Sequence, residues 1–195
     1  MRIGICRAGL VLALCLLVGC QPYRYYGTLL EPAKALNDFT METDTGSEFR
    51  LSEQSKPLIL YFGYTHCPDV CPTTMYHLRE AMQKLGSDGE KVQVGMITVD
   101  PKRDTQEIMH HYVTNFDPTF IGLREDNPDR LATVMSDFGV YAEKGQDSAP
   151  GANDYPVTHS SHIFVVDQSG MRLLISDDAT ADEIASDIRE YLRSQ

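Results

Sequence analysis

The amino-acid sequence predicts an α/β domain with a central mixed sheet, flanked by helices and extended by an N-terminal hairpin. Two observations predict this fold class. Short apolar runs, which are typical of buried strands, alternate with longer segments in which apolar residues recur every three or four positions, as in amphipathic helices. Towards the C-terminus, two apolar runs flank a turn and precede one more helical segment.

The expected strands are short segments bounded by turn residues. The earliest two flank Asp44-Thr45-Gly46 and predict the hairpin, whereas the last two flank Gln168-Ser169-Gly170. The run at 92–99 is mostly apolar, which indicates burial on both faces of the sheet. In chain order, the expected strands are 39–41, 48–51, 58–64, 92–99, 120–123, 163–167 and 171–175.

The expected helices carry an apolar stripe and recognisable ends. Pro72 suits a first turn, where its missing N–H would have no partner anyway. Asp104 or Thr105 is suited to cap the second helix, and Gly139 to close the third. In chain order, the expected helices are 73–85, 104–116, 128–138 and 180–193. Strand–helix–strand–helix, followed by a hairpin and a terminal helix, resembles the thioredoxin-like order.

The first twenty residues resemble the signal of a bacterial lipoprotein. Arg2 and Arg7 form a positive n-region, and residues 8–17 form an apolar h-region that is too short to span a bilayer. Small residues precede Cys20, as in the lipobox of that class. The resemblance implies a signal peptide at 1–19, lipidation of Cys20, and a domain anchored on a membrane outside the cytoplasm, on the periplasmic face of a Gram-negative host. The alternative, an uncleaved N-terminal anchor, gives the same compartment.

The expected organisation after the signal is a tether at 20–35 and one domain at 36–195. The tether is rich in tyrosine, whose side chains suit either a membrane interface or loop packing. Without the signal, the chain has 15 Lys and Arg against 28 Asp and Glu, a formal charge of −13. We expect no nucleic-acid partner, because such an acidic protein binds nucleic acid poorly.

Two cysteines remain once the signal and the lipidation site are set aside. Cys67 and Cys71 lie between the expected strand 58–64 and the expected helix 73–85. A helix N-terminus offers unpaired N–H donors and the positive end of the helix dipole, so this position favours thiolate over thiol. Outside the cytoplasm such a pair is by default a disulfide, and thiolates also bind metals. The expected chemistry is metal binding, redox exchange or both.

A third ligand would distinguish among metals. Two thiolates and one nitrogen suit trigonal Cu(I), Cu(II) is compatible because thiolates cancel its charge, and zinc requires a fourth ligand. His159 and His162 precede the strand 163–167, and in thioredoxin-like folds the loop before that strand packs against the dithiol. At most one of them is a ligand, because residues three apart in an extended segment face opposite sides. The other histidines are assigned to a loop or to solvated helix faces: His66, His77, His110 and His111.

Three separated blocks of sequence carry a family resemblance. Residues 63–72 read GYTHCPDVCP, residues 99–105 read VDPKRDT, and residues 157–160 read VTHS. These blocks resemble the C-P-D-x-C-P, V-D-P-x-R-D-T and V-D-H-S patterns of the Sco/SenC family of copper-binding, thioredoxin-like proteins. The resemblance extends from about residue 36 to the C-terminus.

The resemblance implies that Cys67, Cys71 and His159 are copper ligands. It also implies that the protein delivers copper to the binuclear copper A centre in subunit II of cytochrome c oxidase during assembly. Further implied partners are an upstream copper donor and a thioredoxin-like reductant. Two positions depart from the family pattern: Thr158 stands where the family usually has Asp, and His162 stands where it usually has an apolar residue.

Two other functions compete with that of a metallochaperone. A thiol–disulfide oxidoreductase would use Cys67 and Cys71 as catalytic attacking and resolving thiols, and would reduce the cysteines of the oxidase subunit before metal loading. A binding module would instead hold them as a structural disulfide. The four-residue spacing closes too short a loop for a large gain in stability. The histidine expected beside the dithiol favours copper binding.

Overall fold

A computed structural model describes residues 23–149, 151–152 and 154–195 of the chain. The strands are β1 (Thr28–Lys34), β2 (Thr40–Thr43), β3 (Glu48–Arg50), β4 (Leu58–Gly63), β5 (Gln93–Thr98), β6 (Ile121–Arg124), β7 (Ala142–Lys144), β8 (Val157–His159), β9 (His162–Asp167) and β10 (Gly170–Ser176). The α-helices are α1 (Val70–Leu85), α2 (Gln106–Phe116), α3 (Pro128–Phe138) and α4 (Ala181–Arg193). Short 3-10 turns lie at Leu51–Glu53 and Gly86–Lys91.

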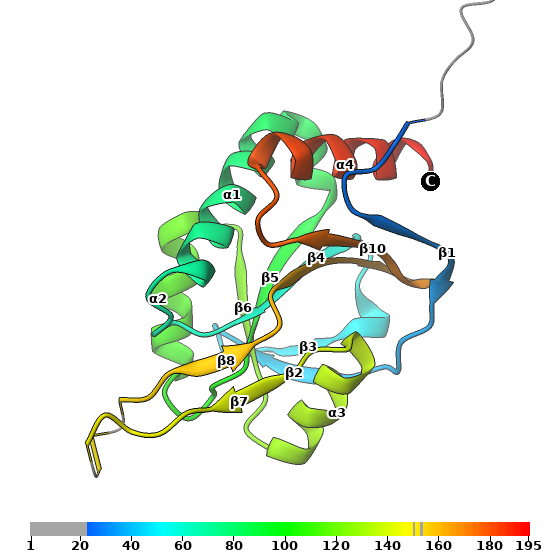
Figure 1. The fold of residues 1–195 in the computed structure, drawn as a ribbon. Coiled ribbons are helices and arrows are strands. Elements are labelled where there is room, and N and C mark those ends of the chain that lie inside the picture. The colour runs from blue at the N-terminus through cyan, green and yellow to red at the C-terminus, as the bar shows by residue number, and fades with distance from the viewer. Residues whose placement is uncertain (1–22, 150, 153) are drawn as a thin grey trace, which may run out of the picture.

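Eight strands form one mixed sheet in the order β1-β10-β9-β4-β5-β6-β2-β3 (Figure 1). Strands β4, β5 and β6 are parallel, whereas β9 is antiparallel to β4. The N-terminal hairpin β2–β3 extends the same sheet through β6. This arrangement confirms the expected mixed sheet with flanking helices and an added hairpin.

The central strand β4 is buried along its whole length, and its side chains alternate between two cores. Ile59 and Tyr61 pack with residues of α1, α2 and α4. Leu60 and Phe62 face the other way, towards α3 and the β2–β3 hairpin. Because β4 is covered on both faces, its carboxyl end is a rigid place from which to start the loop that carries the cysteines.

Helix α1 begins at Val70, three residues earlier than expected. Cys71 therefore lies in the first turn of the helix and not in the loop before it. Pro72 occupies that first turn, as expected. At α2 the cap is Thr105, whose side chain accepts a hydrogen bond from the backbone of Ile108, and α3 ends at the left-handed Gly139 as expected.

The expected tether contains a strand. Residues 28–34 form β1, which pairs with β10 at the edge of the sheet, so the domain begins before residue 36. An edge strand is held mainly by backbone hydrogen bonds, which explains why its side chains show no apolar period. The tyrosine-rich segment packs as a loop at Tyr23, whose hydroxyl donates to Asp187 of α4.

The two-stranded sheet β7–β8 was not expected. It pairs Ala142 with His159 and Lys144 with Val157. Its strands have three residues each, and only Val157 is buried, so the sequence carried no strand signal there. The predicted signal at 1–19 and lipidation at Cys20 fall outside the described residues. Within the described part of the chain, no helix is long and apolar enough to cross a bilayer.

Candidate metal centre

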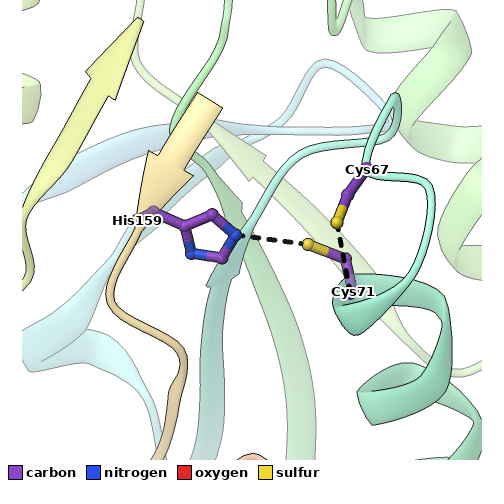
Figure 2. A group of neighbouring side chains, drawn as sticks. All are labelled: Cys67, Cys71 and His159. Carbon is purple, nitrogen blue, oxygen red and sulfur yellow. Dashed lines mark hydrogen bonds between the residues drawn. The ribbon is translucent and has the colours of Figure 1, made fainter. Parts of the chain in front are cut away.

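Three of the predicted site residues meet at the carboxyl end of β4. Cys67 lies in the β4–α1 loop, Cys71 in the first turn of α1, and His159 at the end of β8. Figure 2 shows their side chains converging, and one donor atom from each lies within 4.8 Å of the other two. His162 is not part of this group: it begins β9 and is exposed. Of the two neighbouring histidines, only His159 lies beside the dithiol.

A buried carboxylate fixes the loop that leads to Cys67. Asp104 accepts hydrogen bonds from the backbone N–H of Thr65 at 3.1 Å and from its hydroxyl at 2.6 Å. It also accepts from the hydroxyl of Thr98, at the end of β5, at 2.6 Å. The Asp104 side chain is fully buried, so these bonds are shielded from water and tie the loop to the neighbouring strand.

The sulfur of Cys67 serves as the cap of α1. The side chain of Asp69, at the cap position, makes no capping bond, whereas the backbone N–H of Cys71 points at Cys67 Sγ at 3.5 Å. Burial alone would raise the pKa of Cys67. The backbone N–H groups of Asp69, Cys71 and Val70 stabilise its thiolate and hold the pKa below the ordinary thiol value.

The pKa of Cys71 shifts in the opposite direction. Its side chain is fully buried, and burial raises its pKa to about 12, although the hydroxyl of Tyr61 and the backbone N–H of Tyr64 partly oppose the rise. The expectation that the helix N-terminus favours thiolate is therefore confirmed for Cys67 and wrong for Cys71 in the metal-free protein. Both cysteines are free thiols in the structure.

His159 presents a lone pair to the dithiol. Its Nδ1 lies 3.0 Å from the carbonyl oxygen of Ser160. A carbonyl only accepts, so Nδ1 carries the proton and Nε2 is free. That Nε2 lies 3.4 Å from Cys71 Sγ. Burial lowers the pKa of His159, which keeps the imidazole neutral, as a metal ligand must be.

A second buried cluster holds the segment before His159. Arg103 is paired with Asp100, donates to the carbonyl of Tyr155 at 2.9 Å, and lies 3.7 Å above the Tyr155 ring. The Tyr155 hydroxyl in turn donates to Asp100 at 2.9 Å. Sequence reasoning missed the roles of Arg103 and Tyr155. The available signal was the block at 99–105, since its charged residues follow a buried strand.

The remaining histidines do not join the site. His66 adjoins Cys67, but its half-exposed ring lies 3.1 Å from the Thr65 hydroxyl. His110 contacts the buried carboxylate of Asp44 at 2.7 Å, and His77 donates to the carbonyl of Ala179. The assignment of these last two to solvated faces is therefore incomplete, because each ring is fixed by a partner on another element.

The three donors fit a trigonal copper site. Metal bonds of about 2.0 Å to nitrogen and about 2.3 Å to sulfur place trigonal donors about 4 Å apart. The observed donor atoms, which lie within 4.8 Å of one another, come close to this spacing. Two soft sulfurs and one imidazole match the preference of Cu(I). Thr158, the position that departs from the family pattern, is exposed on β8 opposite Glu143. The orientation of His159 therefore depends on Ser160 and on the Arg103 cluster.

Comparisons with known proteins agree with this geometry. The model of the SCO1/SenC family matches residues 28–193. An SCO2-like protein of Rickettsia prowazekii is 30% identical over 177 residues, which cover 83% of this chain and 85% of that protein. Apo Sco1 from Thermus thermophilus is 38% identical with a TM-score of 0.77, covering 87% of this chain and 98% of that one. ScoI from Bradyrhizobium japonicum, solved with copper bound, is 34% identical with a TM-score of 0.70, and the match covers 80% of this chain and 98% of that one.

Proposed function

The chain belongs to the SCO1/SenC family, and from this premise we propose that it is a copper-binding metallochaperone for the assembly of cytochrome c oxidase. The observation that carries the proposal is the convergence of Cys67, Cys71 and His159 within 4.8 Å, with the imidazole neutral and its Nε2 facing the sulfurs. The copper-bound state of a 34% identical relative supports copper as the cargo.

The asymmetry of the site suits transfer. Cys67 is half-buried and carries the more acidic thiol, whereas Cys71 is enclosed. Copper binding would displace the proton of Cys71, and the neutral His159 would complete a three-coordinate site. Such a site has room for an incoming ligand, so thiolates of a partner can replace the protein's ligands one at a time, beginning at the accessible Cys67.

The proposal includes the recipient and the location. The recipient is the binuclear copper A centre in subunit II of the oxidase, and copper comes from an upstream donor. A signal at 1–19 and a lipidated Cys20 would hold the domain on a membrane outside the cytoplasm. This domain was expected at residues 36–195, and β1 extends it towards the N-terminus. A thioredoxin-like reductant would keep the dithiol reduced there, because an oxidising compartment favours the disulfide.

One observation favours a second function. A half-exposed thiol with a lowered pKa beside a buried thiol with a raised pKa is the arrangement of an attacking and a resolving cysteine. The chain would then act as an oxidoreductase that reduces the cysteines of subunit II before copper arrives. Cys67 would attack the disulfide of the partner, and Cys71 would resolve the mixed disulfide.

Copper titration of the reduced protein tests the proposal. Residues 21–195 keep every residue that the structure describes, and we expect one copper per chain with a visible thiolate-to-Cu(II) charge-transfer band. His159→Ala should lose the band and stable Cu(II) binding, because two sulfurs alone leave the site one ligand short. The matched control, His162→Ala, should bind as the wild type does.

The outcome separates the two functions. Retained Cu(II) affinity in His159→Ala would contradict the assignment of that ligand. Failure of the wild type to bind tight copper would favour the oxidoreductase. In that case the next measurement would be the reduction potential of the Cys67–Cys71 pair and its rate of reduction of a disulfide in a peptide from subunit II.

A further inference from the structure

Tyr61 contributes a buried hydroxyl that the fold does not satisfy. The residue lies in the middle of β4 and is fully buried. The hydroxyl lies near Cys71 and Thr74, but among the described residues it makes no hydrogen bond of good geometry to either of them or to any other group. Burial of a hydroxyl without a partner is unfavourable and uncommon, so it calls for a physical explanation.

The side chain of Tyr61 forms the inner wall of the metal centre. A Cβ atom placed at Gly63 would lie 2.7 Å from Tyr61 Cε1 and 3.1 Å from Cys71 Sγ, so the ring edge and the sulfur converge on the same point. The Tyr61 ring also packs near-perpendicular to the His159 ring, with 6.4 Å between centroids. Gly63 is needed here because any side chain would fill this space.

The hydroxyl proton of Tyr61 is available to Cys71 Sγ. The neighbouring hydroxyl of Thr74 already donates its proton to the carbonyl of Val70 at 3.0 Å. A neutral thiol is a weak acceptor, so the Tyr61 hydroxyl gains little from Cys71 in the metal-free protein. A thiolate bound to copper is a much stronger acceptor, and it is enclosed where water cannot serve as the donor.

We propose that Tyr61 is a positioning residue of the copper site, and that its hydroxyl donates a hydrogen bond to Cys71 Sγ once copper is bound. The inference rests on the proposed function. In the binding step the sulfur–hydrogen bond of Cys71 breaks, the copper–sulfur bond forms, and the proton leaves to solvent. Copper and sulfur keep their oxidation states. The hydroxyl of Tyr61 keeps its proton and shares it with the new thiolate.

This hydrogen bond has a spectroscopic consequence. A donor to the sulfur withdraws electron density from it, and hydrogen bonding around a cysteine ligand tunes the properties of a copper centre. The thiolate-to-Cu(II) transition should therefore need more energy with the hydroxyl present. Tyr61→Phe should move the band to longer wavelength and weaken Cu(II) binding by about 10-fold.

Comparison with a matched variant separates this role from a structural one. The fully buried Tyr191 donates its hydroxyl to Asp167 at 2.7 Å. Asp167 follows Val166, which pairs with Leu58 at the start of β4, so this tyrosine lies at the opposite end of the strand from the dithiol. Tyr191→Phe removes a satisfied hydroxyl, whereas Tyr61→Phe removes an unsatisfied one.

The experiment is a Cu(II) titration and a thermal melt of the metal-free form, on residues 21–195 of the wild type and both variants. We expect the shifted band and weaker binding only in Tyr61→Phe, with an unchanged or higher melting temperature for its metal-free form. Tyr191→Phe should keep the wild-type band and melt earlier. An unshifted band with wild-type affinity in Tyr61→Phe would overturn the inference. Absence of copper binding by the wild type would overturn the proposed function itself.

Discussion

At the scale of single residues, the dithiol combines two thiols of different character. Cys67 is half-buried and receives backbone N–H groups, so its pKa lies below the ordinary value. Cys71 is enclosed by β4 and α1, and burial raises its pKa to about 12. The copper-free protein therefore holds one thiol that ionises more readily than an ordinary cysteine and one that ionises less readily.

This difference predicts selective alkylation. In a short pulse of iodoacetamide at pH 7, Cys67 should react at least about 100-fold faster than Cys71, because only the thiolate is nucleophilic and Cys71 is shielded. Raising the pH towards 9 should increase the ionised fraction of Cys67 and leave Cys71 almost entirely protonated. Peptide mass spectrometry measures both rates. Equal rates, or a reactive Cys71 in the Cys67→Ser variant, would contradict the structure.

The motif blocks pointed to the three residues of the candidate metal centre but not to their ionisation states. The two cysteines before a helix follow from local patterns, whereas His159 and His162 both precede a strand and the family resemblance selected His159. Ionisation depends on which atoms surround each group. The carbonyl of Ser160 that sets the proton on His159, and the Tyr61 hydroxyl beside Cys71, are features of packing.

At the scale of elements, a buried ion pair connects two loops of the site. Arg103 and Asp100 follow β5, whereas Tyr155 precedes β8, and all three side chains are packed against one another. The cluster joins the segment that carries His159 to the same β5–α2 loop that anchors Thr65 through Asp104. The two halves of the metal centre therefore share one support.

Arg103→Met should be strongly destabilising. The substitution leaves the buried carboxylate of Asp100 without its cation, and breaking such a pair costs about 3–5 kcal/mol in the free energy of unfolding. The control is Arg193→Met, because its pair with Glu190 lies at the surface, with the two side chains 69% and 30% exposed. That change should cost about 1 kcal/mol or less. Urea unfolding measures both; similar losses in the two variants would contradict a special role for the cluster.

The elements that the sequence predicted well are those with local end signals. Helix α3 has the expected bounds because Asn127 caps its start, Pro128 occupies its first turn and Gly139 ends it. Strands β1, β7 and β8 were missed because pairing across the chain, not their composition, makes them strands. The start of α1 was placed too late because the cap is a cysteine sulfur, which is not a usual capping group.

At the scale of the whole molecule, the N-terminal segment closes the fold. Asp187 of α4 is fully buried, and its carboxylate accepts from the Tyr23 hydroxyl and from the backbone N–H groups of Tyr26 and Gly27. Strand β1 then covers the edge of β10. The segment expected to be a tether is thus part of the domain.

Removal of this segment should destabilise the protein and promote its association. A chain that begins at Ala35 leaves Asp187 without these three donors and exposes the edge of β10, so we expect a loss of more than about 3 kcal/mol in the free energy of unfolding. A chain that begins at Tyr23 is the control. Urea unfolding and sedimentation measure the two effects. Equal unfolding midpoints and a monomeric truncated chain would contradict this account.

The sequence by itself determined the fold class, the order of the central elements and the place of the dithiol between a strand and a helix, and the family resemblance of its motif blocks pointed to His159 beside that dithiol. The first three of these follow from local patterns: apolar periodicity, end signals and motif spacing. Only the tertiary structure decided the extent of the domain, the unequal pKa values of Cys67 and Cys71, and the buried groups around them. These depend on distances between residues far apart in the chain, because burial and hydrogen bonding are set by the atoms that folding brings together.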